Sequence, residues 1–181
     1  AQVSAAAGYR VILTDVSAER AEAGKAGITR QLARAVEKEK IDAATRDATL
    51  ARIEPVAGVA TMGECGLVIE AATEREEIKR AIFKDVGAVL AADAVLASNT
   101  SSIPITRLAQ ATPDPARFIS VHFFNPVPVM GLIEVIRGLA TADATVATIE
   151  DYADRLGKAV VRANDAPGFI VNRVLMPMIN E

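Results

Sequence analysis

Hydrophobic and polar positions alternate along the chain in blocks of two kinds. Short runs of consecutive apolar residues are separated by longer segments in which Ala, Ile and Leu recur among Arg, Glu and Lys. Unbroken apolar runs are typical of strands that are buried on both faces of a sheet, and the longer segments have helical spacing. The runs that predict strands cover residues 10–14, 66–70, 94–97, 118–121 and 132–136, and the clearest helical segments cover residues 18–39, 76–90 and 145–156.

This alternation predicts an α/β fold built on a doubly wound sheet with right-handed crossovers. The charged helical region from Glu19 to Arg52 is longer than a simple crossover needs. We therefore expect residues 18–52, approximately, to form a helical arm that extends beyond the sheet.

Both ends of the chain have the pattern of interior pieces of helices. Residue 1 is not Met, and residues 1–8 predict the last turns of an alanine-rich helix that Gly8 closes. At the other end, a helical pattern starts at Pro167, passes through Met176 and continues to Glu181. We therefore expect further sequence before residue 1 and after residue 181.

Composition excludes several classes of protein. A chain of 181 residues suits one medium domain, or one domain and part of another. A net charge of -3 and an aromatic content of 4% leave no basic stripe and few stacking platforms, so nucleic acid is not an expected partner. Cys65 is the single cysteine, so we expect neither a disulfide framework nor a metal site. No apolar run approaches about 18 residues, so a soluble cytoplasmic protein without a membrane partner is expected.

The candidate chemistry lies in two apolar segments. His122 is the only histidine, in the run VHFFNP, and Glu134 lies in the run LIEVI. One imidazole and one carboxylate in hydrophobic surroundings are suited to general base catalysis near neutral pH. Upstream, the polar cluster Ser98–Ser102 lies between two apolar segments and concentrates hydroxyl and amide groups at one turn.

Asp15 closes the first predicted strand. A carboxylate at this place in a doubly wound fold can accept hydrogen bonds from both ribose hydroxyls of an adenine nucleotide, and it disfavours a 2′-phosphate. Asp15 would then select NAD over NADP. The alternative is that Asp15 only starts the turn into the helix that begins near Ser17.

Four motifs give the chain a resemblance to the L-3-hydroxyacyl-CoA dehydrogenase family. They are VIEAATE at residues 68–74, SNTSS at 98–102, HFFNPVPVM at 122–130 and PGFIVNR at 167–173. The run at 126–134 is most similar to the bacterial 3-hydroxybutyryl-CoA dehydrogenase branch. The resemblance implies a Rossmann-type NAD-binding domain at residues 1–165. Residues 166–181 would then be the first helix of an all-helical dimerisation and substrate domain, and the full-length protein would be a homodimer.

The resemblance also implies roles for four catalytic residues. His122 would be the base that takes the proton from the substrate 3-hydroxyl, and Glu134 would orient its imidazole. Ser101 and Asn172 would hydrogen-bond the substrate oxygen, so both also count as substrate-binding residues. The alternatives are a plain turn residue for Ser101 and a polar helix-face residue for Asn172.

Further positions match family residues at the cofactor and at coenzyme A. Glu74, Lys79 and Asn99 would lie near the nicotinamide and its ribose, and Asn125 would lie near the base. Lys38 would contact the nucleotide part of coenzyme A. For Lys79 the alternative is a solvated helix face, and for Lys38 it is an exposed run of charges.

By this resemblance, the expected function is the reversible, NAD-dependent oxidation of an (S)-3-hydroxyacyl-CoA, in the first place 3-hydroxybutyryl-CoA. Three alternatives stay open: a 3-hydroxyadipyl-CoA dehydrogenase, the central part of a multifunctional β-oxidation protein, and a non-catalytic dinucleotide-binding relative. Residues 1–181 by themselves are expected to show little activity, because the phosphate-binding glycine loop and most of the helical domain would be missing.

Overall fold

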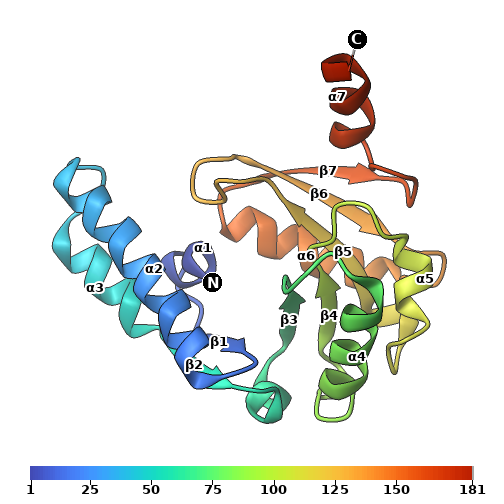
Figure 1. Cartoon of the computed structure of the whole chain (residues 1–181), viewed down its shortest axis with the longest axis horizontal. Helices are drawn as coiled ribbons and strands as arrows, with labels where there is room; N and C mark the ends of the chain where they lie inside the picture. Colours follow the sequence, from blue (N-terminus) through green and yellow to red (C-terminus); the bar gives the residue numbers. More distant parts are fainter. Residues whose placement is uncertain (181) are drawn as a thin grey trace. The chain divides into compact units, whose positions relative to one another are not determined.

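A computed structural model describes residues 1–180 of the chain (Figure 1). The residues form two compact units, which comprise residues 1–61 and the residues from 62 onward. Each unit has its own sheet, with two strands in the first and five in the second. The prediction of an α/β fold of the doubly wound, Rossmann type is confirmed.

The first unit is a small parallel sheet with helices. Its elements are α1 (Gln2–Ala6), β1 (Val11–Asp15), α2 (Ala18–Glu37), α3 (Ala43–Ala51) and β2 (Ile53–Ala57). Strands β1 and β2 are parallel, with Leu13 opposite Pro55. Helix α2 packs against both strands, and glycine at position 24 allows its close approach, because a Cβ there would lie 3.3 Å from Leu13 Cδ2. The predicted closure of α1 is confirmed, since Gly8 follows it with a φ of 97°.

The predicted arm consists of two helices. Helix α2 is capped at its N-terminus by Ser17, whose Oγ accepts the N–H of Arg20, and Glu39, two residues after its end, has a φ of 55°. Helix α3 is capped at its N-terminus by Asp42, whose Oδ1 accepts the N–H of Thr45 at 2.7 Å. These caps satisfy N–H groups that have no partner within the helix. The two helices contact each other and lie side by side in Figure 1.

The second unit contains the larger sheet. The short 3₁₀ helix η1 (Ala60–Glu64) precedes the sheet. The helices and strands that follow in this unit are β3 (Leu67–Glu70), α4 (Glu76–Gly87), β4 (Val95–Ser98), α5 (Ile105–Ala109), the 3₁₀ helix η2 (Pro115–Arg117), β5 (Phe118–Phe123), β6 (Leu132–Arg137), α6 (Asp143–Arg155), β7 (Ala159–Ala163) and α7 (Val171–Asn180). The strand order follows the chain from β3 to β7. Neighbouring strands are parallel except β5 and β6, which are antiparallel.

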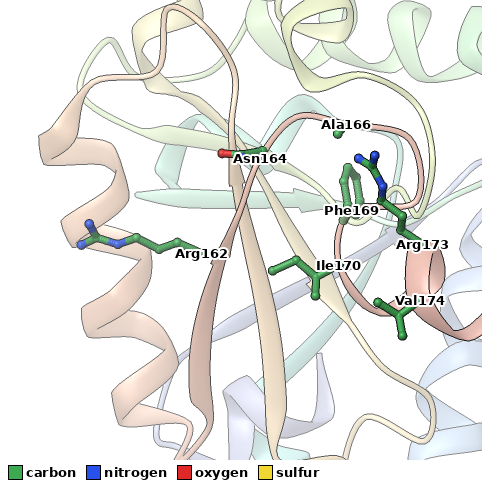
Figure 2. Close-up of a pocket in the computed structure, with 7 residues that line it drawn as sticks. All are labelled: Arg162, Asn164, Ala166, Phe169, Ile170, Arg173 and Val174. Carbon is green, nitrogen blue, oxygen red and sulfur yellow. The ribbon is translucent and has the colours of Figure 1, made fainter.

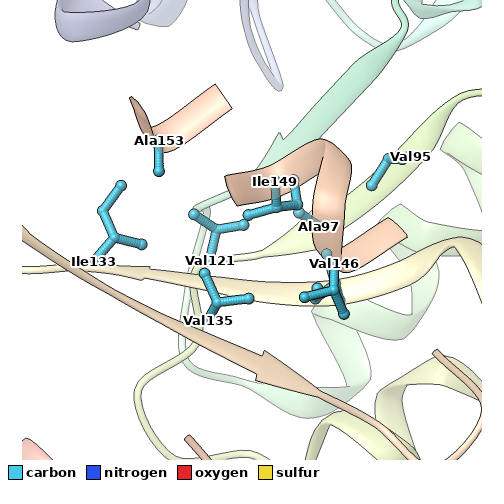
Figure 3. Packing of buried hydrophobic residues seen from close by; sticks show 9 residues of the cluster. Val95, Ala97, Val121, Ile133, Val135, Val146, Ile149 and Ala153 are labelled. Atoms are coloured by element: carbon cyan, nitrogen blue, oxygen red, sulfur yellow. The ribbon is translucent and has the colours of Figure 1, made fainter. Parts of the chain in front are cut away.

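The two faces of this sheet have different side chains. One face packs against α6 in an apolar core, with Val121, Ile133 and Val135 of the strands against Val146 and Ile149 of the helix (Figure 3). Because side chains alternate along a strand, His122 and Glu134 project from the opposite face. That face also contains Phe118, whose ring meets Phe83 of α4 edge-on with centroids 5.1 Å apart.

Helix α7 leaves the sheet after β7 and projects away from it (Figure 1). None of its described residues is buried, although several are large and apolar. The exposed apolar side chains of α7 are Val174, Leu175, Met176, Met178 and Ile179. Glu181, where the predicted helical pattern stops, lies outside the described residues. Nowhere in residues 1–180 is there a helix with the length and apolar character to cross a membrane.

Candidate active site

His122 and Glu134 lie directly opposite each other on the antiparallel strands β5 and β6. Nδ1 of His122 is 2.7 Å from Oε2 of Glu134, and the exposed fractions of the two residues are 5% and 0%. A carboxylate can only accept hydrogen bonds, so Nδ1 carries the proton in this contact. In the neutral imidazole Nε2 is then an acceptor, and within residues 1–180 it has no hydrogen-bond partner.

Two phenylalanine rings enclose the imidazole. The centroid of Phe124 lies 4.8 Å from that of His122, and the centroid of Phe169 lies 5.6 Å away at an edge-on angle of 65°. Phe169 is buried and has a φ of 51°, a left-handed conformation that side chains rarely adopt. Neither ring was among the predicted site residues. Phe124 is one of several apolar neighbours of His122 in sequence, and Phe169 lies far from it along the chain.

The second carboxylate oxygen of Glu134 binds the start of α7. Oε1 accepts the N–H groups of Ile170 at 3.1 Å and of Val171 at 2.8 Å. A negative charge is favourable at a helix N-terminus, where N–H groups lack partners within the helix. Asn172 follows directly in the first turn of α7. Glu134 therefore connects His122 to the helix that carries Asn172.

Glu74 organises the polar turn after β4. Its Oε1 accepts from Thr100 Oγ1 at 2.6 Å, from the N–H groups of Ser101 and Ser102 at 2.8 and 3.1 Å, and from Ser102 Oγ at 3.0 Å. Burial works to raise the pKa of Glu74, but these donors, with the Lys79 ammonium, outweigh it and hold the pKa below its usual range. Ser101 thus has its backbone fixed by a carboxylate. Thr100 was not predicted, although its hydroxyl lies in the quoted motif.

Asn99 joins this turn to the strand that carries His122. Its Oδ1 accepts the N–H of Phe123 at 2.9 Å, and its own N–H donates to the carbonyl of Glu70. Asn99, Ser101 and Glu74 are therefore brought together at the carboxyl ends of β3 and β4, next to the residue that follows His122. This is the end of a parallel sheet at which doubly wound folds bind ligands.

Lys79 lies in the interior and not on a solvated helix face, so that alternative is wrong. Its exposed fraction is 1%, and Nζ lies 3.0 and 2.7 Å from the two carboxylate oxygens of Glu70 and 3.7 Å from Oε2 of Glu74. Glu70 also accepts from Ser98 Oγ at 2.9 Å and from the N–H of Ala72 at 2.8 Å. A buried ammonium requires such a partner. The ion pair was not predicted, because it joins the end of strand β3 to helix α4, and their packing is not evident from the sequence.

Asn125 starts the loop that follows the histidine, and its peptide bond to Pro126 is cis. Lys158, the residue before β7, holds this loop, since its Nζ donates to the carbonyls of Val127 at 2.8 Å and Met130 at 2.6 Å. Burial lowers the pKa of Lys158. No sequence signal indicated this contact, which joins segments that are distant in the chain.

Two predicted residues belong to the first unit. Asp15 is exposed at the end of β1, and its Oδ1 accepts the N–H of Val16 at 2.7 Å. This contact is the turn role that was the alternative for Asp15, and it engages one of the two carboxylate oxygens. Lys38 is exposed where α2 ends. Their binding roles stay predictions.

A cavity of about 300 Å³ lies between β7 and the start of α7 (Figure 2). Phe169, which contacts the imidazole, also lines this cavity. The lining residues are Arg162, Asn164, Ala166, Phe169, Ile170, Arg173 and Val174. The structure brings none of the predicted site residues into this cavity. Among the 180 described residues, no cluster of three His, Cys, Asp or Glu side chains could hold a metal ion.

The chain is similar to known proteins along its whole length. The family model described as "3-hydroxyacyl-CoA dehydrogenase, NAD binding domain" matches residues 1–166. The chain is 50% identical over 181 residues to a 3-hydroxybutyryl-CoA dehydrogenase of Bradyrhizobium diazoefficiens and spans 62% of that protein. It is 45% identical over 181 residues to a probable 3-hydroxybutyryl-CoA dehydrogenase of Bacillus subtilis and spans 63% of it.

Solved structures give the same result. The crystal structure of (S)-3-hydroxybutyryl-CoA dehydrogenase from Ralstonia eutropha superposes with a TM-score of 0.96 at 43% sequence identity, covering 99% of this chain and 63% of that one. This chain thus spans less than two thirds of the length of these relatives. The predicted resemblance and the predicted cofactor class, NAD, are confirmed at the level of the family.

Proposed function

Because the chain belongs to the family of 3-hydroxyacyl-CoA dehydrogenase NAD-binding domains, we propose that its protein oxidises (S)-3-hydroxyacyl-CoA reversibly to 3-ketoacyl-CoA. The observation that carries this proposal is the buried contact between His122 and Glu134, which leaves one ring nitrogen as an acceptor. Such a pair supplies what base catalysis on a hydroxyl group requires.

The residues at the strand ends fit NAD. Asp15 presents an exposed carboxylate at the end of a parallel strand, where ribose hydroxyls can donate to it. Glu74, Asn99 and Asn125 would lie toward the nicotinamide and its ribose, and Lys79 would act there through Glu74, since its protons are directed to Glu70 and Glu74. Bound NAD supplies the acceptor for the hydride that leaves C3 of the substrate.

His122 moves the proton in this proposal. Nε2 takes the proton of the substrate 3-hydroxyl, and in the reverse direction the imidazolium returns a proton to the oxygen. Glu134 accepts from Nδ1 throughout, so it fixes the tautomer and stabilises the imidazolium. Phe124 and Phe169 pack against the ring and exclude water from it, which strengthens the electrostatic interaction with Glu134.

Ser101 and Asn172 would donate hydrogen bonds to the substrate oxygen, whose charge changes during the reaction. The support for Ser101 is its backbone bond to Glu74, and the support for Asn172 is its place in the first turn of the helix that Glu134 binds. Lys38 would pair with a phosphate of coenzyme A as a point charge.

We propose 3-hydroxybutyryl-CoA as the substrate, on the strength of the relatives that carry this name. A 3-hydroxyadipyl-CoA dehydrogenase is the second candidate, because an Escherichia coli protein of that name is 42% identical over 181 residues. The two candidates differ in whether the acyl chain ends in a carboxylate. Rates with acetoacetyl-CoA and with 3-ketoadipyl-CoA separate them.

Three further proposals concern the whole protein. Residues 1–165 would be the NAD-binding domain and residues 166–181 the start of a helical domain. The protein would form a homodimer and act in the cytoplasm. Sedimentation of the protein as its gene encodes it measures the oligomeric state, and a stable monomer would contradict the proposed dimer.

The test of the proposed function is the oxidation of NADH by acetoacetyl-CoA, followed by NADH absorbance, with the protein as its gene encodes it. We expect turnover in the unmutated protein and a loss of about 10²- to 10⁴-fold in His122→Ala, the usual contribution of a general base. The control is binding of NADH to both proteins. A folded, NADH-binding protein with no turnover on any acyl chain would refute the proposal and favour a non-catalytic relative.

A further inference from the structure

The segment that connects β7 to α7 is anchored by a second carboxylate, Asp165. Its Oδ1 accepts the N–H of Ile105 at 2.7 Å, and its Oδ2 accepts the N–H of Thr106 at 2.8 Å. These are the first residues of α5, whose N–H groups have no partner within the helix. Both oxygens of Asp165 therefore bind backbone in a distant part of the chain.

The two helices that Asp165 and the segment after it join, α5 and α7, both lie next to predicted site residues. Helix α5 follows the polar turn that contains Ser101, and α7 begins with the turn that contains Asn172. Asp165 anchors the connecting segment on the side of α5, and Glu134 anchors it on the side of α7 through Ile170. The segment is thus fixed at two points that both lie within the second unit.

The backbone between these two anchors is strained at Phe169. Gly168 has a φ of 75°, which glycine adopts freely, and Phe169 has a φ of 51°, which a residue with a side chain rarely adopts. A side chain in this conformation persists only where its surroundings fix it. In this conformation the Phe169 ring lies against His122. Without an anchor at Asp165, the segment could relax and release both Phe169 and the start of α7.

We propose that Asp165 is a positioning residue for the reaction, which holds the start of α7, and with it Asn172, in place relative to Ser101 and His122. This inference rests on the proposed function. Asp165 acts through the backbone of α5 and has no contact with a reacting group. Its loss therefore affects the alignment of Asn172 and leaves the NAD side of the site unchanged.

Gly138 offers a second way to disturb the same contact. A Cβ at position 138 would lie 3.2 Å from the backbone nitrogen of Thr106 and 3.3 Å from its Cα. The N–H of Leu139 also donates to Thr106 Oγ1 at 3.1 Å. Gly138→Ala should push Thr106 out of line with Asp165 without changing the carboxylate itself.

The first arm of the experiment does not depend on activity. Asp165→Asn keeps the side-chain size, but the amide nitrogen cannot accept, so one N–H of α5 loses its partner. We expect the Ile170 and Val171 amides, which bind Glu134, to exchange hydrogen at least about tenfold faster. The matched control is Asp114→Asn, because Asp114 also accepts a backbone N–H, that of Ala116 at 2.9 Å. Unchanged exchange at residues 170 and 171 in both Asp165→Asn and Gly138→Ala would overturn the proposal.

The second arm is a double-mutant cycle with Asn172→Ala, measured on turnover of acetoacetyl-CoA by the protein as its gene encodes it. Asp165→Asn should lower kcat by roughly 10- to 100-fold, the effect of a misplacement near 1 Å, with the KM for NADH unchanged. In the Asn172→Ala background the further loss should be under about twofold. If the losses of kcat in Asp165→Asn and Asn172→Ala multiply in full in the double variant, the proposal is overturned. Absence of turnover in the unmutated protein would refute the proposed function, and hydrogen exchange would then decide whether Asp165 holds α7.

Discussion

Two buried ion pairs on the same face of the larger sheet differ in how fully their hydrogen-bonding groups are used. In the pair of Lys79 and Glu70, the two carboxylate oxygens accept four hydrogen bonds, two from the ammonium and two from Ser98 and Ala72. In the pair of His122 and Glu134, the carboxylate accepts three, and within residues 1–180 Nε2 of the imidazole has no partner.

This difference separates a structural pair from a reactive one. Burial of two charges is costly, and a pair whose groups are all satisfied internally has no capacity left for a ligand. A pair that keeps one acceptor available, beside aromatic rings that exclude water, can take a proton from a bound hydroxyl. The two pairs should therefore respond differently to the loss of one partner.

The largest expected effect comes from Glu134→Gln. The amide would bind the helix N–H groups through its oxygen and direct its nitrogen at Nδ1 of His122, which then has to accept. The imidazole proton would move to Nε2, and the base would be lost. We expect turnover to fall by about 10²- to 10⁴-fold. Near-normal turnover in a folded Glu134→Gln protein would show that the orientation of His122 is not required.

The next effect is on stability. Lys79→Met leaves the Glu70 carboxylate buried without its counter-charge, so the free energy of unfolding should fall by about 3–5 kcal/mol. Lys84→Met, at an exposed position on the same helix, is the matched control and should change little. Glu70→Leu combined with Lys79→Met should recover most of the loss, since both charges are gone. Denaturant unfolding measures all three, and an unstable double variant would contradict this account.

The smallest effect concerns Glu74. Its folded-state pKa lies below the ordinary value of 4.5, so the carboxylate contributes stability that is present above pH 4.5 and is lost as the pH falls through the folded-state value. The side chain is 44% exposed, so solvent screening limits this contribution to less than about 1 kcal/mol. Glu74→Gln should therefore be less stable than the unmutated protein near neutral pH and nearly equal in acid. If the stability difference between Glu74→Gln and the unmutated protein grew in acid, this account of Glu74 would be contradicted. Glu77→Gln, at an exposed position, is the control, and an equal loss of stability there would also contradict it.

Five of the seven strands could be predicted from the sequence. Strands β1, β3, β4, β5 and β6 are all present where short runs rich in apolar residues predicted them. Strands β2 and β7 were not predicted: β2 contains Glu54 and Pro55, and β7 contains Arg162. Both strands end a sheet and have largely accessible side chains, so their sequences have little need of apolar residues.

Some features of the candidate site could likewise be predicted from the sequence, and others could not. The motifs predicted that His122 and Glu134 act together, and the antiparallel register places them opposite each other. The burial of Lys79 was not predictable, because it depends on Glu70, and Glu70 is exposed or buried only according to how β3 and β4 pair. Asp165 was missed because an acidic residue before a Pro-Gly sequence has the pattern of an ordinary turn.

The most direct test of the central claim is the tautomer of His122, which nitrogen NMR of the labelled imidazole reports without any substrate. The account predicts that neutral His122 has its proton on Nδ1, in the bond to Glu134, with Nε2 unprotonated and able to accept the substrate proton. A proton on Nε2 in the folded protein would contradict the account, because His122 could then not act as the base in the geometry that Glu134 imposes.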